Sequence, residues 1–350
     1  MSGDLLRCAA TAAEDLLGSV FRLHVRKALD PLDDDDFLVI VDRIGRALGK
    51  ATRKSEAAAL RAALDVLDVD WAKLTELARV RVINAARKAM DALSSAVLPK
   101  VDQVLAVQAP QLIGWTRTGV HQRFGIRVGT RTDLIDGRIA AFTRRSESLF
   151  IRDELGRRQL ELSQRARNVV AEGLERGLGR DDIASQLAAE LAPVVARGPA
   201  YWQTIAASFA ARARSYTELD SFNEAGIERF RFEAVLDQVT SSICRFMHGR
   251  EFSVERARQR FDQVEGAQTP EQIADLQPWV RSGRDHAGNQ VLFFERAGHR
   301  HLVARIDQPA VGRLDEVGRY SRALGVDALE AAGITAPPLH GRCRSTLIPA

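Results

Sequence analysis

Residues 230–236 read Phe-Arg-Phe-Glu-Ala-Val-Leu, and this short stretch decides the fold class. The even positions are apolar and the odd ones mostly charged, which is the two-residue period of a half-buried β-strand. No earlier stretch of the chain alternates in this way, because the apolar residues upstream recur every three or four positions. We therefore predict helices in the first part of the chain and strands only after about residue 225.

Further strands are expected downstream of this stretch. Gln290–Glu295 and His299–Ile306 flank Ala297-Gly298 and are typical of a hairpin, and Arg344–Ile348 forms a last short strand. The sequence thus predicts an α+β fold, in which a long, mostly helical N-terminal half precedes a small C-terminal domain of helices plus a short antiparallel sheet.

Upstream, residues 4 to about 130 are expected to be helical almost throughout. The acidic run Asp33–Asp36 is a natural helix cap, and it lacks the glycine and distal glutamate of a calcium loop. A long helix is predicted from Asp70 to about Val107, with Pro99 as its only interruption. Apolar stripes precede that helix, at Leu5, Leu6, Leu16, Leu17, Val20 and Leu23 and then at Phe37, Ile40, Val41, Ile44 and Leu48. An elongated arm and a bundle that packs on itself both fit this pattern.

Glycine and proline divide the chain into three units. The expected elements are a linker over Gly125–Gly137, a helix over Glu147–Leu174, a turn at Gly177-Leu178-Gly179, a helix from Asp181, and a helix over Ile205–Leu219 that Gly226 closes. The predicted units are a helical arm or bundle over 1–130, a helical linker with the helix, glycine turn, helix part over 131–226, and an α+β C-terminal domain over 227–350.

Composition sets only broad limits. The 350 residues are 45% hydrophobic and 27% charged, which leaves room for two or three domains. We expect no membrane span, because no apolar run approaches about 18 residues. We also expect no signal peptide, because Met1-Ser2-Gly3-Asp4 lacks a basic n-region followed by an apolar h-region and a cleavage site. Three cysteines argue against a disulfide scaffold and for a reducing compartment, with Cys8 as a small buried hydrophobe. The formal charge of +4 permits contact with nucleic acid without demanding it.

Two blocks about a hundred residues apart hold the most reactive side chains. The first is Asp237-x-x-Thr240-Ser241-x-x-Cys244-Arg245-x-x-His248-Gly249, and the second is Pro337-Pro338-x-His340-x-x-Cys343-Arg344-Ser345. Cys244 and His248 are one helical turn apart, and His340 and Cys343 follow a stiff Pro-Pro at a spacing of three. The two pairs could therefore meet in a tetrahedral Cys₂His₂ zinc site.

Two other arrangements of these blocks stay open. In a metal-free polar cluster, Asp237 and the Thr240 hydroxyl would hold a turn while Arg342 or Arg344 pairs with Asp237. In the third arrangement, Cys244 and Cys343 form a disulfide. The metal and disulfide arrangements both require the two sulfur atoms to lie within about 10 Å of each other.

Other candidate residues have simpler explanations. Arg212 and Arg214, with Tyr216, could touch phosphate, but we expect them on an exposed helix face. His299 and His301 share a face of the hairpin and could form a ligand pair, but we prefer to interpret them as part of a solvated edge strand.

The ordered elements from about residue 160 to 350 resemble the phage Mu F-like minor head proteins, a family of phage head morphogenesis proteins. Members of that family carry a helix, glycine turn, helix unit, an arginine-bearing helix that ends in glycine, and a strand that enters the first block. The pattern D-x-x-T-[C/S]-x-x-C-x-x-x-[D/H]-G-x-x-[F/Y] matches Asp237, Thr240, Ser241, Cys244, His248, Gly249 and Phe252. The pattern P-P-x-H-x-x-C-R-[C/S]-x-[L/I] matches Pro337, Pro338, His340, Cys343, Arg344, Ser345 and Leu347. Ser241 and Ser345 replace cysteines of many relatives, which argues against a four-thiolate metal site.

The resemblance implies a minor head component of a phage or prophage, present in few copies. Such a protein binds the portal protein and the procapsid or capsid proteins, and it is placed to contact packaged DNA. The implied location is the virion, in the head interior or at the portal vertex, and the host cytoplasm during assembly. No membrane partner and no catalytic activity are expected, and zinc is the one cofactor considered.

The alternative is a phage-delivered effector enzyme built on the same domain. A toxin-like transferase or nuclease would act through Asp237, His248 and His340. The family-like domain runs to the last residue, which leaves no appended toxin. A deep cleft lined by Glu251, Glu295 and the histidines would favour the enzyme, whereas a closed, packed cluster would favour a binding protein.

Overall fold

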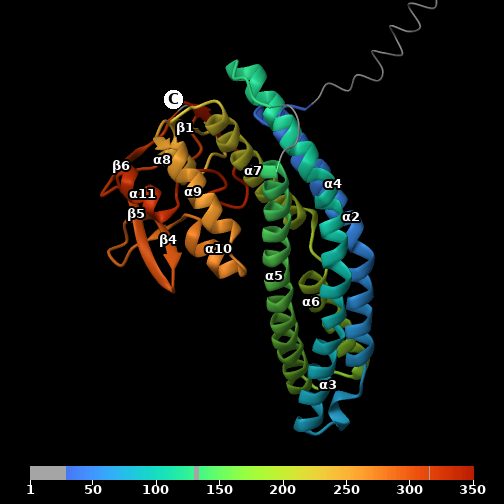
Figure 1. Ribbon diagram of the computed structural model, residues 1–350. Coiled ribbons are helices and arrows are strands. Elements are labelled where there is room, and N and C mark those ends of the chain that lie inside the picture. The colour runs from blue at the N-terminus through green and yellow to red at the C-terminus, as the bar shows by residue number, and fades with distance from the viewer. Residues whose placement is uncertain (1–28, 130–133, 315) are drawn as a thin grey trace, which may run out of the picture.

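The computed structural model describes residues 29–129, 134–314 and 316–350 (Figure 1). The predicted stripe from Leu5 to Leu23 and Cys8 lie outside the described residues. Among the residues that are described, none before 229 belongs to a β-strand. The predicted order of helices first and strands later is therefore confirmed for the described part of the chain.

Six α-helices form an elongated bundle, which we call the helical body (Figure 1). They are α2 (Asp34–Leu67), α3 (Glu76–Ala89), α4 (Asp91–Phe124), α5 (Leu134–Glu175), α6 (Arg180–Val195) and α7 (Pro199–Glu224), with a 3₁₀ turn at Trp71–Lys73 between α2 and α3. Residues 131–226 supply α5, α6 and α7, and their apolar side chains share one core with those of α2 to α4.

Local sequence explains how the first helices begin and end. The Asp33 carboxylate accepts the Asp36 backbone N–H at 3.1 Å, which confirms the predicted cap of α2. The continuous helix predicted from Asp70 to Val107 is wrong, because the chain breaks at Met90 between α3 and α4. Pro99 lies inside α4 and on its exposed side, where water can satisfy the carbonyl group that proline leaves without a donor.

The helix predicted from Glu147 starts thirteen residues earlier, at Leu134, so the predicted linker over Gly125–Gly137 is too long. A glycine marks the end of a helix when its backbone adopts the left-handed conformation. Gly137 does not do so, because it has helical geometry inside α5. At the other end of α5, Gly177 has φ +68° and forms the predicted turn to α6.

Residues 227–350 form the C-terminal domain, which contains two antiparallel sheets where one was expected. The first sheet has the order β2 (Glu251–Ser253), β1 (Arg229–Glu233), β7 (Thr346–Pro349), and the second has β3 (Arg281–Arg284), β4 (Gln290–Arg296), β5 (His299–Gln308), β6 (Arg319–Ser321). Four short helices complete it: α8 (Ser242–Met247), α9 (Val254–Glu265), α10 (Pro270–Leu276) and α11 (Val326–Ala332). The predicted hairpin is present, with positive φ at Ala297 and Gly298. The α+β class is confirmed.

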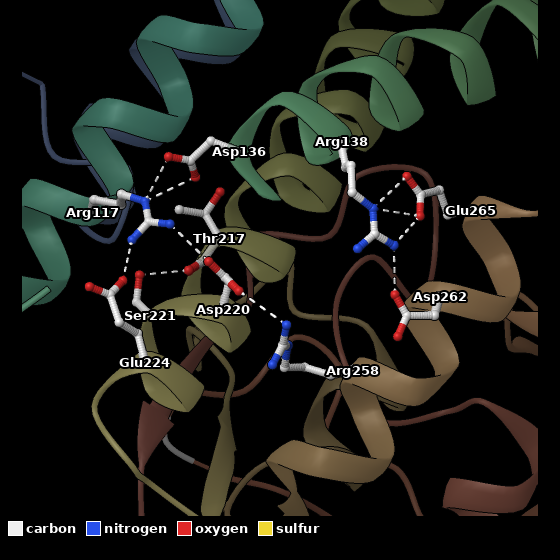
Figure 2. A network of polar contacts seen from close by, with 10 residues as sticks. All are labelled: Arg117, Asp136, Arg138, Thr217, Asp220, Ser221, Glu224, Arg258, Asp262 and Glu265. Atoms are coloured by element: carbon white, nitrogen blue, oxygen red, sulfur yellow. Dashed lines mark hydrogen bonds and ion pairs between the residues drawn. The ribbon is translucent and has the colours of Figure 1, made fainter. Parts of the chain in front are cut away.

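A polar network joins the helical body to the C-terminal domain, and we call it the junction network (Figure 2). Its charged members are Arg117 on α4, Asp136 and Arg138 on α5, Asp220 and Glu224 on α7, and Arg258, Asp262 and Glu265 on α9. The Arg117 guanidinium lies 2.8–2.9 Å from three carboxylates, and Arg258 reaches the Asp220 carboxylate at 3.4 Å. These ion pairs, together with an apolar core that α4, α5 and α7 share with the C-terminal domain, fix the relative position of the two parts.

No helix in the described part of the chain combines the length and the apolar character that crossing a membrane requires.

Candidate metal centre

Strand pairing brings the two sequence blocks together. β1 leads into the first block and β7 follows the second, and the two strands pair antiparallel, with Phe232 opposite Leu347. The residues that follow β1 and precede β7 therefore meet at one end of the sheet. This explains how residues about a hundred positions apart come into contact.

Three side chains from the blocks form one group, which we call the Cys/His cluster. Cys244 lies in the first turn of α8, where the Ser241 hydroxyl accepts its backbone N–H at 3.3 Å. The Cys244 Sγ atom lies 3.7 Å from Cys343 Sγ and 3.2 Å from His340 Nε2. The three ligand atoms all lie within 4.8 Å of one another, a geometry in which they could hold a metal ion. The prediction that the two sulfur atoms lie close together is confirmed.

The two thiols differ in acidity. The hydrogen bond with Cys343, helped by burial, raises the pKa of the Cys244 thiol well above its usual range. Burial also opposes ionisation of Cys343, but hydrogen bonds from Cys244 and His340 outweigh it and hold the pKa of Cys343 well below its usual range. The cluster therefore favours one thiol beside one thiolate, and the thiolate is the form that binds a metal.

The four-ligand site predicted from the sequence is wrong in one member, because His248 does not join the cluster. The α8 helix ends at Met247, so the one-turn spacing from Cys244 does not carry the His248 ring to the same side. Its Nδ1 instead accepts the Ala234 backbone N–H at 3.2 Å and lies 3.9 Å from a Glu233 carboxylate oxygen. His248 thus contacts the end of β1.

The Asp237 turn lies beside the cluster and has the contacts expected of the polar alternative. One Asp237 carboxylate oxygen lies 2.8 Å from the Thr240 hydroxyl and accepts the Val239 N–H at 3.0 Å. The other oxygen accepts a bond from Arg344, which also reaches Asp34 at 2.7 Å. Although partial burial opposes it, bonding from Arg344 and Thr240 lowers the pKa of Asp237. The polar turn and the Cys/His cluster therefore coexist.

Gly249 has a backbone role in the first block. Its φ of +77° lies in the left-handed region, and its N–H donates to the Phe232 carbonyl at 2.9 Å. This turn sends the chain from α8 into β2, which pairs with β1. A side chain at this position would strain the turn.

Sequence reasoning missed the buried arginine of the first block. Arg245 is 1% exposed, and its guanidinium donates to the backbone carbonyls of Asp237, Thr240, Arg313 and Glu316. It ties the Asp237 turn to the loop before β6. No periodicity or motif spacing identifies a partner some seventy residues away.

The expected exposure of Arg212, Arg214 and Tyr216 is wrong, since all three side chains are buried. They lie on α7, which is covered by the helical body on one side and by the C-terminal domain on the other. Arg212 pairs with the buried Glu147 carboxylate, and Arg214 donates to the carbonyl groups of Arg344 and Ser345. They hold the fold together and are closed to phosphate.

The remaining candidates stay apart from the cluster. His299 and His301 are exposed on β5, and the His301 ring stacks on Phe294. Glu295 lines a cleft of about 460 Å³ between the helical body and α10. Among the described residues, neither Glu251 nor any histidine lines that cleft. This cleft therefore lacks the histidines on which the enzyme alternative depends.

Only a small hollow opens beside the cluster. It measures about 20 Å³ and is lined by residues that include Ser241, Cys244, His340 and Ser345. Cys343 is fully buried, and Cys244 is 3% exposed. The hollow can hold a water molecule or a metal ligand, but it has no room for a larger molecule.

Comparison with models of known families, with curated proteins and with solved structures gives no significant match.

Proposed function

We propose that the protein is a minor head protein of a phage or prophage and that it acts in head morphogenesis by binding. Its partners would be the portal protein and the procapsid or capsid proteins, in the host cytoplasm during assembly and then in the virion. The observation that carries the proposal is the contact between the two sequence blocks. The residues that give the resemblance lie about a hundred positions apart in the sequence. In the C-terminal domain they lie together around the buried Cys/His cluster.

The closed centre supports binding over catalysis. Its thiols are buried, and the hollow beside them is too small for a substrate. The bundle of α2 to α7, in contrast, presents long exposed helix faces of the kind that partner proteins use. No observation favours the effector enzyme specifically, since Asp237 is engaged by Arg344 and His248 points to β1.

We further propose that zinc occupies the Cys/His cluster. Two thiolates bound to tetrahedral zinc, with zinc–sulfur bonds of about 2.3 Å, have their sulfur atoms about 3.8 Å apart. The observed separation is 3.7 Å, whereas a disulfide requires about 2.05 Å. Cys244, His340 and Cys343 would be the protein ligands, and the hollow next to Ser241 leaves space for a fourth. The zinc would have a structural role, fixing the segment before β7 to α8.

The head function is tested in the phage or prophage that encodes the chain. We expect deletion of the gene to lower the yield of infectious particles, and mass spectrometry to find the protein in purified wild-type particles at a few copies. Wild-type protein supplied from a plasmid should restore the yield. Two results together would refute the proposal: normal infectivity after deletion of the gene, and purified wild-type particles in which mass spectrometry does not find the protein.

The zinc assignment has a separate test. Protein purified under reducing conditions without added metal should contain about one zinc per chain by elemental analysis. Treatment with a strong chelator should then lower the melting temperature of the C-terminal domain. A Cys244–Cys343 disulfide found by mass spectrometry in the freshly isolated protein, with no metal, would favour the disulfide instead.

A further inference from the structure

One exposed face of α2 carries a continuous row of basic side chains. We call this row the basic stripe, and its members are Arg43, Arg46, Lys50, Arg53, Lys54 and Arg61. All six residues are exposed. The one acidic residue between Arg43 and Arg61 is Glu56, which is 4% exposed and pairs with Arg158 inside the bundle. The exposed charged side chains of this segment are therefore all cationic.

Helical geometry places the stripe along one line. At 100° per residue, its members fall within about a quarter of the helix circumference, and they extend over about 27 Å. The opposite side of α2 is buried, with Ile44 and Leu48 in the core and Gly49 packed on Trp202. The stripe thus faces away from the helical body, at whose outer edge α2 lies (Figure 1).

Most of these charges lack a carboxylate partner. Within the residues that the structure describes, no ion pair involves Arg43, Lys50, Arg53 or Lys54. Among the described residues, Arg46 is the one member of the stripe that pairs with a carboxylate, that of Asp42. In the junction network, by contrast, every arginine has at least one carboxylate partner. Uncompensated charge in a row is the feature that attracts a polyanion.

The other side chains on this face identify the kind of polyanion. The exposed large apolar residues of α2, Leu38 and Val39, lie before the stripe, and Ala57 is the exposed residue between Lys54 and Arg61 on the same line. A membrane-binding helix needs large apolar anchors, and a protein interface needs a buried apolar centre. Binding of single strands needs aromatic side chains for stacking. A purely cationic row suits the regularly spaced phosphates of a duplex.

We propose that the basic stripe binds the phosphate backbone of double-stranded DNA without reading its sequence. The stripe has no asparagine or glutamine, the side chains that pair with base edges most often after arginine and lysine. It also lies outside residues 160–350, which carry the resemblance to head proteins. The inference therefore stands on α2 alone and does not depend on the proposed function.

The test compares two variants of the full-length protein with equal reduction in charge. The stripe variant is R43Q/K50Q/R53Q/K54Q. The control variant is R81Q/K88Q/R152Q/R167Q, in which four exposed basic residues of α3 and α5 are changed instead. Glutamine retains helix propensity, and thermal unfolding checks that both variants fold. Fluorescence anisotropy with duplex DNA of random sequence measures affinity over a series of salt concentrations.

We expect the stripe variant to bind at least tenfold more weakly than wild type at low salt. The slope of log affinity against log salt should decrease by about 0.9 for each phosphate that the variant no longer neutralises, while the control variant stays near wild type. If the two variants bind DNA equally weakly, the loss of affinity follows from the lower net charge and not from the position of the stripe, and the proposal is overturned. Wild-type protein that binds anionic lipid vesicles but not duplex DNA would overturn it as well.

Discussion

The junction network and the Cys/His cluster hold the molecule together in different ways. In the junction network, Arg117 on α4 is 2% exposed, and its partners are 19 to 107 residues away on α5 and α7 (Figure 2). In the Cys/His cluster, Cys244 from the first block meets His340 and Cys343 from the second block at one end of the sheet that contains β1 and β7. The comparison teaches that the junction network depends on charge compensation between distant residues, whereas the cluster brings together three side chains that could hold a metal ion.

The largest expected effect comes from breaking charge compensation at the junction. Arg117→Ala leaves the carboxylates of Asp136, Asp220 and Glu224 without this cation, and we expect a loss of about 3–5 kcal/mol in the free energy of unfolding. Arg138→Ala is the matched control, because Arg138 also bonds two carboxylates but its side chain is 41% exposed. We expect the control to lose about 1 kcal/mol or less in urea unfolding. Equal losses would show that burial does not distinguish the two arginines.

The next effect is a pH dependence from Glu218, where α7 meets β7. Burial raises the pKa of Glu218 to about 7 from the usual 4.5, despite Arg214 and Arg123 nearby and bonds from Thr346 and Leu347. The folded state therefore binds this proton more tightly than the unfolded state does. Its stabilising contribution is complete below about pH 4.5 and is lost as the pH rises through 7, by about 3 kcal/mol in total.

Glu218→Gln tests that contribution. The uncharged amide should remove this part of the decline in unfolding free energy between about pH 5 and 8, measured by urea titration at each pH. Glu172→Gln, an exposed change on α5, should leave the decline unchanged. An identical pH profile for the Glu218 variant and wild type would contradict the prediction.

The smallest expected effect is the difference in zinc content and stability between variants of His340 and His248, the two histidines of the sequence blocks. His340→Ala removes a residue of the proposed zinc site, so from that proposal we expect loss of bound zinc and about 2 kcal/mol of stability. His248→Ala removes one hydrogen bond to Ala234, and we expect about 1 kcal/mol and full zinc content. Elemental analysis with thermal unfolding measures both quantities. Zinc loss in the His248 variant would restore the four-ligand site predicted from the sequence.

The parts of the fold that could be predicted are those with a local cause. β1, the hairpin and the cap at Asp33 each follow from residues within a few positions, and all three are present. β2, β3 and β6 have only three or four residues, too few for alternation to be recognised. The break at Met90 also has no glycine or proline to mark it. Tertiary packing decides these features.

The same limit applies to the site. Cys244, His340 and Cys343 were predicted because spacing and residue type identify them, and pairing of β1 with β7 brings them together. His248 was misplaced, because the prediction assumed that α8 continues one residue further. Arg212 and Arg214 resemble an exposed helix face in the sequence, since only the three-dimensional structure places elements on both sides of α7.

The contact of Arg344 with Asp34 has a consequence for the order of folding. These residues are 310 positions apart, and Arg214 on α7 donates both to the Pro31 carbonyl and to that of Arg344. During synthesis from the N-terminus, α2 can form early, but Asp34 in its first turn can pair with Arg344 only after that residue has been synthesised. Contacts between such distant residues are slow to form. Pro31 and Asp34 therefore gain these contacts only when the segment before β7 has docked.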